Sequence, residues 1–463
     1  MSKYDYDFTV IGGGSGGYAA ARTAAALGLR TAVVEGGERI GGLCILRGCM
    51  PTKALLYAAE VNHLVQHAKT WGIKVPDSHA DYAAIKSRKD SLIKEFADFR
   101  EEQLRDGRFE FIHAHASFMD PNTVNLSSGG QLTSKHFVIA TGSKVSPVPL
   151  KALETIGVIT SDDALAADAL PESIIVLGGG AIAIEFAQFY QRMGVKTTII
   201  QRSSHLLKEM DTDVSEETRN ALESEGLTIY TGTQLLDAKK EGATKTVVFQ
   251  QGDDLIEVSA EAILHALGRS PATDTLNLTA AGVETNRGRI VTNNQMRSLT
   301  APHIFAAGDC TGPHDVVHIA IQQGEIAAYN ATSPKKPKEI QYDQTMSIVF
   351  SDPQVAVVGM TEAQAHAQGI PVHTASYPFN DHGKSMIMDA QHGFVKLIAE
   401  KGSGKLLGGA CVGPVGGELI HEVAVAIAAK MTASQFARVP HYHPTLAEIW
   451  TYPAEDIVDE MDS

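Results

Sequence analysis

A glycine-rich turn between a strand and a helix occurs twice in this 463-residue chain, and this repeat constrains the fold more than any other feature. The positions that define the two turns are Gly12, Gly14 and Gly17 in the first copy, and Gly178, Gly180 and Ala183 in the second. The copies lie 178 − 12 = 166 residues apart. Solenoid repeats recur every ~20 to 50 residues, so this spacing predicts two separate dinucleotide-binding units.

The first copy has the sequence features of a pyrophosphate site. We expect a strand over residues 6–11, a helix over 18–27 and a second strand over 31–34. Glycines in such a turn let the backbone approach a pyrophosphate at the helix N-terminus. Glu35 ends the second strand, where a carboxylate can accept hydrogen bonds from ribose hydroxyls. These residues alone leave FAD and NAD open.

The second copy differs at the position that selects the nicotinamide cofactor. We expect strands over 173–177 and 196–200, with a helix over 182–193 between them. Gln201 stands where an NAD site carries an acid, and Arg202 and Lys208 follow it. Cations favour the 2′-phosphate of NADP, so the sequence favours NADPH. NADH is the alternative if Arg202 is a solvated surface charge.

Two cysteines stand close together in the segment GGLCILRGCMPTK. Cys44 and Cys49 are separated by four residues, of which the last is Gly48. A first helical turn can bring such a pair within bonding distance. A pair that cycles between disulfide and dithiol can pass electrons to a substrate, with one thiolate attacking and the other facing the donor.

The motif GGxCxxxGCxPxK after the first glycine turn resembles the class I pyridine nucleotide-disulfide oxidoreductases, a family that includes dihydrolipoamide dehydrogenase, glutathione reductase and mercuric reductase. Further motifs match in order at residues 140–143, 178–185, 266–269, 300–309 and 443–448. The resemblance implies an α/β fold with two Rossmann-like nucleotide-binding domains, for FAD and NAD(P), plus a C-terminal α+β dimerisation domain. The expected domains are 1–150 and 273–342 for FAD, 151–272 for NAD(P), and 343–463 for the interface.

The resemblance also implies roles for individual residues. Cys44 would be the interchange thiol, and Cys49 would contact the flavin. Lys53 would approach the flavin and pair with Glu185. The other cofactor-binding residues that it implies are Ala116, Thr141, Gly142, Asp309 and Val317, together with Gly268 and Arg269.

His443 and Glu448 stand five positions apart in HPTLAE, a spacing at which a carboxylate can orient an imidazole for proton transfer. By resemblance, this dyad reaches across a homodimer and protonates the thiol that leaves at the partner's disulfide. His441 lies two residues earlier, but no cluster of further ligands accompanies it, so we expect no metal site.

The sequence therefore predicts an enzyme that passes electrons from NADPH through FAD and Cys44–Cys49 to a small disulfide. Open alternatives are an NAD-linked dihydrolipoamide dehydrogenase, a quinone or metal-ion reductase or transhydrogenase, and a non-enzymatic redox sensor. Leu43, Leu46 and Ala181 depart from the patterns best known in the family, which puts flavin tuning and specificity in doubt.

The charge balance disfavours two classes of partner, and the other two cysteines are not expected to take part in the chemistry. The net charge of −15 disfavours nucleic acid and anionic membranes. We expect a cytoplasmic protein, because no signal core or long apolar stretch is present. Cys310 and Cys411 have no near partner in sequence and are expected to be buried, inert thiols.

Overall fold

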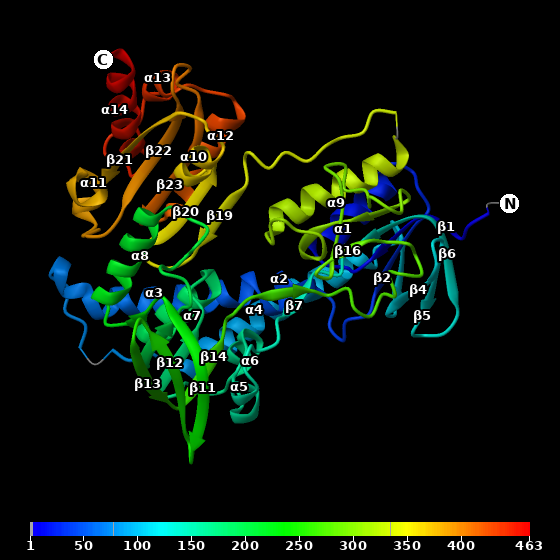
Figure 1. Cartoon of the computed structure of the whole chain (residues 1–463), viewed down its shortest axis with the longest axis horizontal. Coiled ribbons are helices and arrows are strands. Elements are labelled where there is room, and N and C mark those ends of the chain that lie inside the picture. Colours follow the sequence, from blue (N-terminus) through cyan, green and yellow to red (C-terminus); the bar gives the residue numbers. More distant parts are fainter. Residues whose placement is uncertain (1–2, 77, 334) are drawn as a thin grey trace. The chain divides into compact units, whose positions relative to one another are not determined.

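The computed structural model describes residues 3–76, 78–333 and 335–463. The chain forms two compact units. The first comprises Met1–Ala54, Lys86–Pro147 and Gly268–Gln341, and the second comprises Leu55–Ile85, Val148–Leu267 and Tyr342–Ser463. Figure 1 labels the helices and strands of both units.

A parallel sheet forms the centre of the first unit. Its strands run in the order β3 (Glu110–His113), β2 (Thr31–Glu35), β1 (Tyr6–Ile11) and β6 (Gln131–Ile139), and β18 (Ile304–Ala306) also pairs with β6. Helix α1 (Ser15–Ala26) connects β1 to β2 and packs against α9 (Val317–Thr332). A Cβ at Gly324 would lie 2.2 Å from the Gly16 carbonyl oxygen, so glycine is what lets these two helices approach so closely.

The rest of the first unit consists of small sheets and the helices around the cysteines. β4 (Ala116–Asp120) and β5 (Thr123–Leu126) extend β6 as antiparallel strands. Two short antiparallel pairs follow: β7 (Ser143–Val145) with β15 (Arg269–Pro271), and β16 (Thr285–Asn286) with β17 (Arg289–Ile290). The remaining elements are α2 (Gly42–Arg47), η2 (Gly308–Cys310), and parts of α3 (Cys49–His67) and α4 (Tyr82–Leu104).

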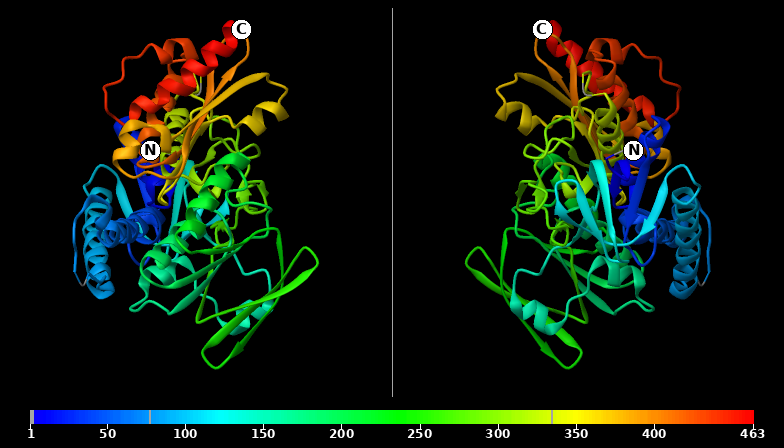
Figure 2. Two further views of the ribbon diagram at one scale, coloured as in Figure 1. Left: turned by 90° about the vertical axis from the view of Figure 1, so that its left-hand side faces the viewer. Right: turned by 90° about the vertical axis from the view of Figure 1, so that its right-hand side faces the viewer.

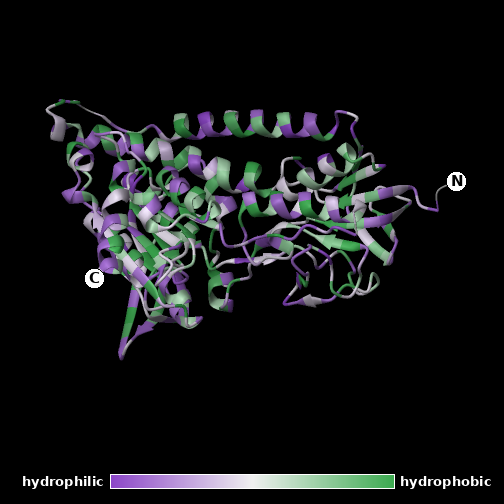
Figure 3. Ribbon diagram, turned by 90° about the horizontal axis from the view of Figure 1, so that it is seen from above, coloured by the Kyte–Doolittle hydropathy of each residue, from purple (hydrophilic) through white to green (hydrophobic). Residues whose placement is uncertain are grey.

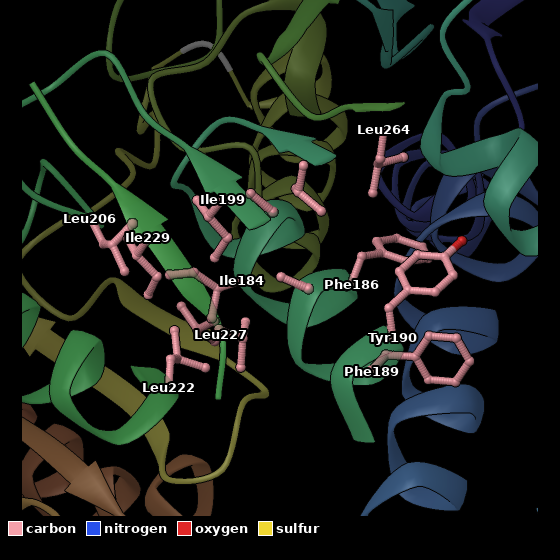
Figure 4. Close-up of a cluster of buried hydrophobic side chains, with 14 of the residues drawn as sticks. Ile184, Phe186, Phe189, Tyr190, Ile199, Leu206, Leu222, Leu227, Ile229 and Leu264 are labelled. Carbon is pink, nitrogen blue, oxygen red and sulfur yellow. The ribbon is translucent and has the colours of Figure 1, made fainter. Parts of the chain in front are cut away.

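The second unit contains another parallel sheet, ordered β10 (Thr228–Tyr230), β9 (Lys196–Ile200), β8 (Ser173–Leu177) and β14 (Ala262–His265). Helix α7 (Ala181–Arg192) connects β8 to β9, and its buried face includes Phe186, Phe189 and Tyr190 (Figure 4). Flanking elements are α5 (Lys151–Ile156), α6 (Ser161–Ala166), α8 (Thr212–Ser224), η1 (Ala68–Trp71), and the antiparallel strands β11 (Thr233–Glu241), β12 (Thr244–Gln251) and β13 (Asp254–Ala260).

The C-terminal part of this unit is a five-stranded antiparallel sheet. Its order is β19 (Met346–Val349), β20 (Gln354–Gly359), β23 (Leu406–Gly413), β22 (Phe394–Glu400) and β21 (Val372–Pro378). Helix α12 (Gly416–Ala428) packs on β20 and β23, and α14 (Thr451–Asp462) packs on β21, as the orange and red segments of Figure 2 show. Shorter helices are α10 (Glu362–Ala367), η3 (Phe379–Asp381), α11 (Gly383–Ile387), α13 (Ala433–Ala437) and η4 (Ala447–Trp450).

The predicted α/β architecture is confirmed, including both glycine-turn units and the α+β C-terminal part. The stretch FEFIHAHASF is strand-like in composition throughout, but the structure divides it between β3, which is parallel in the main sheet, and β4, which is antiparallel to β5. Helices α3 and α4 begin at Cys49 and Tyr82, earlier than the starts at Ala54 and Ser91 that their apolar spacing predicts.

Hydrophobic and hydrophilic residues alternate along the helices (Figure 3). Among the described residues, no helix is both long and apolar enough to cross a membrane.

A buried lysine ties the C-terminal sheet to the nucleotide-binding part of the second unit. The Lys396 side chain is 5% exposed, and its Nζ lies 2.9 Å from Asp213, 2.9 Å from Glu362 and 3.2 Å from Asp211. Burial lowers the pKa of Lys396, but hydrogen bonds to Glu362 and Asp213 and the charge of Asp211 raise it above its ordinary value. The lysine therefore stays charged and offsets part of the negative charge of its three acidic neighbours.

Replacing Lys396 with methionine is expected to destabilise the protein by about 3 kcal/mol, because it leaves the buried carboxylate of Asp211 without its cation. Thermal unfolding should show a lower Tm. Lys239→Met is the matched control, since its ion pair with Glu257 is exposed and should leave Tm unchanged. Equal Tm values for the two variants would contradict the structural role of Lys396.

Candidate active site

The first glycine turn is held by two contacts that exclude a side chain. Gly12 has φ +107°, and a Cβ there would lie 2.4 Å from the Ala140 carbonyl oxygen. A Cβ at Gly17 would lie 1.8 Å from the carbonyl oxygen of Gly12. Gly14 is the N-cap of α1 and provides no side-chain cap. The first-turn N–H groups of α1 are therefore available to a ligand phosphate.

Glu35 lies at the end of β2, as the sequence predicts. Its Oε2 accepts a hydrogen bond from the Gly13 N–H at 2.6 Å, and its Oε1 accepts one from the Gly37 N–H at 2.7 Å. The carboxylate thus holds both the glycine turn and the loop after β2. Each oxygen keeps a lone pair for ribose, and that contact stays a prediction.

The residues after β6 leave polar groups for a bound molecule. The Thr141 hydroxyl is buried and has no hydrogen-bond partner among the described residues. A Cβ at Gly142, where φ is +68°, would meet no described atom within 4 Å. Ala116 is buried at the start of β4, and Val317 begins α9. These features fit a dinucleotide such as FAD lying along this edge of the sheet.

Asp309 belongs to a short hydrogen-bonded chain. The Ser143 hydroxyl donates to Asp309 Oδ2 at 2.5 Å, and Arg269 Nε donates to Ser143 Oγ at 2.8 Å. Burial raises the pKa of Asp309, and the hydrogen bond from Ser143 opposes that change. Gly268 accepts from the Ser146 N–H through its carbonyl at 3.1 Å. The predicted contact of Asp309 with a flavin side chain stays a prediction.

Arg100 of α4 is a candidate that sequence patterns do not reveal. Its guanidinium lies 4.3 Å from the ring centroid of Tyr18, in the first turn of α1. Its Nε and Nη1 atoms are buried, and no described residue accepts a hydrogen bond from them. Burial lowers the pKa of Arg100. A half-buried guanidinium with two buried N–H groups that lack an acceptor suits a site that receives an anionic ligand.

Cys44 and Cys49 lie on two helices that meet at Gly48. Cys44 is in α2, Cys49 begins α3, and both are half-buried free thiols in the structure. A Cβ at Gly48 would lie 3.0 Å from the Leu43 carbonyl oxygen, and the Thr52 hydroxyl donates to the Gly48 carbonyl at 2.7 Å. These contacts hold the two helix ends together.

The two thiols contact each other. A hydrogen bond to Cys49 raises the pKa of the Cys44 thiol, burial raises it further, and the charge of Lys53 lowers it. The two sulfurs are therefore adjacent. Such a pair is positioned to form a disulfide.

The structure shows the surroundings of all three residues that depart from the family pattern. The Leu46 side chain packs near Gly41, and its Cδ2 lies 3.1 Å from the position that a Cβ of Gly41 would occupy. Leu43 contributes its carbonyl to the contact with Gly48. Ala181 is the first residue of α7 and packs against the core of the second unit.

The second glycine turn repeats the geometry of the first. Gly178 has φ +122°, and a Cβ there would lie 2.4 Å from the Ala266 carbonyl oxygen. A Cβ at Gly180 would meet no described atom within 4 Å, whereas Ala183 is fully buried. The second turn thus tolerates a methyl group at the position where the first requires Gly17.

The residues after β9 separate into a buried glutamine and exposed cations. The Gln201 side chain packs over Gly179, whose Cβ would lie 2.8 Å from Gln201 Cγ. Arg202 is exposed, and within the described residues no ion pair involves it. Lys208 instead pairs with Glu209 at 3.2 Å. Of the two predicted cations, Arg202 is the one without a competing carboxylate.

The structure brings His443 and Glu448 together. His443 Nδ1 lies 3.1 Å from Glu448 Oε1 and 3.0 Å from Oε2. The His443 side chain is 79% exposed, whereas that of Glu448 is 12% exposed. The ring is therefore oriented from a buried carboxylate while its Nε2 side faces outward. Lys53 and Glu185 belong to different units, and their predicted pairing stays a prediction.

A third residue joins this dyad. His382 is fully buried, and its Nε2 lies 3.2 Å from Glu448 Oε1. The two residues are 66 positions apart, so no motif spacing could have linked them.

His441, Cys310 and Cys411 have surroundings that favour a structural role over a catalytic one. His441 is held at both ring nitrogens, by Glu422 at 2.6 Å and by the Val439 carbonyl at 2.8 Å. No cluster of three or more metal-binding side chains occurs in the parts of the chain that the structure describes. Cys310 and Cys411 are fully buried; burial raises the pKa of Cys310 to about 11 and also raises that of Cys411. Both are thus poor nucleophiles.

Comparison with known proteins adds independent evidence. The family model for the pyridine nucleotide-disulphide oxidoreductases matches residues 6–324, and the model for the dimerisation domain of that family matches residues 345–454. A dihydrolipoyl dehydrogenase from Geobacillus stearothermophilus is 34% identical over 96% of this chain and 95% of its own length. A mercuric reductase from Bacillus cereus is 33% identical over 96% of this chain and 70% of its own length.

A solved structure gives the same result for the fold. The HOCl-induced flavoprotein disulfide reductase RclA from Escherichia coli superposes with a TM-score of 0.86 at 25% sequence identity. The match covers 97% of this chain and 99% of the other.

Proposed function

This chain belongs to the pyridine nucleotide-disulphide oxidoreductase family, and from that premise we propose that Cys44 and Cys49 carry electrons from NADPH to a small disulfide. Family membership confirms the predicted enzyme class, a flavin-dependent oxidoreductase that uses FAD and NAD(P)H. It also establishes a dimerisation domain over residues 345–454.

The observation that carries the proposal is the contact between the two thiols at Gly48. The hydrogen bond between Cys44 and Cys49 requires neighbouring sulfurs, and Lys53 lies close enough to favour a thiolate electrostatically. Loss of a proton from one thiol produces the nucleophile, and the second thiol is placed to attack the first sulfur later. No other described cysteine shares these surroundings, since Cys310 and Cys411 are fully buried.

Each sulfur step can be written for this pair. The Cys44 thiolate attacks the substrate disulfide, forming a mixed disulfide and expelling one thiolate, which takes a proton from His443. Cys49 then gives up its proton and attacks the Cys44 sulfur, forming the Cys44–Cys49 disulfide, and the second substrate sulfur leaves as a thiolate that takes up a proton. When bound, FAD and NADPH supply the two electrons that restore the dithiol.

His443 is proposed to serve the disulfide of a second copy of this chain. Its ring is exposed while its orienting carboxylate is buried, which is the arrangement expected of a group that acts outside its own fold. The dimerisation domain that contains it supports this role. The expected assembly is a homodimer in which each protomer completes the other's site.

The coenzyme preference is proposed to rest on Arg202. Replacing Arg202 with glutamate should lower kcat/KM for NADPH by about 50-fold, because it exchanges a charge-assisted hydrogen bond to the 2′-phosphate for repulsion. The value for NADH should change much less. Steady-state kinetics with each coenzyme measure the ratio directly.

Lys208→Ala is the matched control for this test. Because Lys208 pairs with Glu209, Lys208→Ala should lower kcat/KM for NADPH less than Arg202→Glu does. An unchanged NADPH-to-NADH ratio in Arg202→Glu, or a preference for NADH in the unmodified protein, would contradict the assignment of NADPH.

The second candidate function is reduction of a metal ion by the same flavin. It is favoured by the relative that is a mercuric reductase, although that match covers 70% of the relative. Turnover of Hg²⁺ or Cu²⁺, compared with a small disulfide in the same assay, distinguishes the two functions. Faster turnover of the disulfide supports the proposal, and turnover of the metal ion alone contradicts it.

A further inference from the structure

We infer that His382 is a positioning residue for the dyad, holding the Glu448 carboxylate in the orientation that fixes the His443 ring. The inference rests on the proposed function, in which His443 protonates the leaving thiol. It concerns a residue outside the HPTLAE motif, on the segment between η3 and α11.

Four side chains form a continuous hydrogen-bonded series. Ser385 Oγ lies 2.7 Å from His382 Nδ1, and His382 Nε2 lies 3.2 Å from Glu448 Oε1. The same oxygen lies 3.1 Å from His443 Nδ1. Ser385 and His382 are fully buried, whereas the far end of the series, His443, is exposed. The series thus runs from the protein interior to the surface.

The direction of each hydrogen bond follows from the acceptor. A carboxylate only accepts, so the ring nitrogen that faces Glu448 must carry hydrogen on both histidines. In the neutral His382 ring, Nδ1 then accepts from the Ser385 hydroxyl. In His443, Nδ1–H donates to Glu448, which leaves Nε2 to exchange the proton with a thiol. Glu448 therefore selects the His382 tautomer, and Ser385 supplies the donor for the remaining ring nitrogen.

Packing holds the His382 ring in place. The ring meets the Tyr452 ring edge-on, with centroids 6.2 Å apart, and Tyr452 stacks on Tyr377 at 4.1 Å. The Tyr377 hydroxyl donates to Asp381 Oδ2 at 3.1 Å, beside His382 in the chain. A ring fixed on this side leaves little freedom for the carboxylate that it contacts. Glu448 is then held by two imidazoles instead of one.

The test separates the two half-reactions by anaerobic stopped flow. His382→Phe keeps an aromatic ring at this position but removes both nitrogens. Reoxidation of this reduced variant by a small disulfide should be about tenfold slower, as expected for one lost charge-assisted hydrogen bond. His382→Gln, which restores a donor, should recover part of the rate. Reduction by NADPH should be unchanged in both variants.

Two further variants complete the design. Ser385→Ala keeps the His382 ring but removes the hydrogen bond that holds its Nδ1, so it should slow reoxidation less than His382→Phe does. This variant provides the test if His382→Phe does not fold. His373→Phe is the control, because His373 forms a 2.8 Å pair with Glu460 in the same C-terminal part, apart from the dyad. This control should reoxidise at the unmodified rate.

The outcomes distinguish this inference from the proposed function. His443→Gln is measured alongside, and slow reoxidation there with unmodified rates in His382→Phe and Ser385→Ala overturns the role of His382. Equal slowing in His382→Phe and His382→Gln also overturns it, since packing alone would then explain the effect. An unmodified rate in His443→Gln overturns the proposed function, and with it the inference.

Discussion

Replacing Cys44 with serine is expected to lower disulfide turnover by about 1,000-fold or more, as is usual when a catalytic nucleophile is removed. Serine keeps the size of the side chain but cannot supply a thiolate. Reduction of the bound flavin by NADPH should persist, because the proposed role of Cys44 lies after that step. Stopped-flow reduction and steady-state turnover measure the two properties separately.

Cys310→Ser is the matched control for this change. Cys310 is fully buried and burial raises its pKa to about 11, so its loss should leave turnover intact apart from any effect on stability. Disulfide turnover that survives in Cys44→Ser would contradict the redox role of the pair. Retained quinone or metal-ion reduction in the same variant would show a second activity that bypasses it.

Replacing Gly17 with alanine is expected to release FAD and to destabilise the first unit by about 3 kcal/mol, the upper part of the usual cost of overpacking. The added Cβ would lie 1.8 Å from the Gly12 carbonyl oxygen, which is backbone and cannot move without opening the turn. The flavin-to-protein absorbance ratio after purification and Tm with and without added FAD measure the effect.

Gly180→Ala provides the comparison in the second turn, where a Cβ would meet no described atom within 4 Å. It should keep its FAD and its Tm, even if NADPH binds less well. A Gly17→Ala protein with full flavin content and unchanged Tm would contradict the tight-turn account of the first site.

The sequence predicts best where a local pattern is dictated by backbone geometry. The two glycine turns were recognisable because Gly12 and Gly178 each lie against the carbonyl oxygen of a neighbouring strand end, Ala140 or Ala266, which only a glycine permits. The position of Glu35 at the end of β2 is predicted by the same βαβ segment. Such features are set by neighbours within one βαβ segment, so they leave a signature in the sequence.

Contacts between distant segments leave no such signature. The Lys396 cluster joins residues from β22, α8 and α10, and His382 meets Glu448 across 66 positions. A buried lysine or histidine looks like any polar residue in a strand or loop until its partners are known. The division of FEFIHAHASF between two strands has a related cause, because pairing with β2 and β5 decides it.

Anaerobic titration with NADPH tests the central claim, that Cys44 and Cys49 accept electrons from the flavin. The unmodified protein should take up twice as many electrons per flavin as Cys44→Ser, because a disulfide and a flavin each accept two. A long-wavelength charge-transfer band should also appear in the unmodified protein at half reduction. Equal electron uptake by the two proteins, with no such band, would contradict the account.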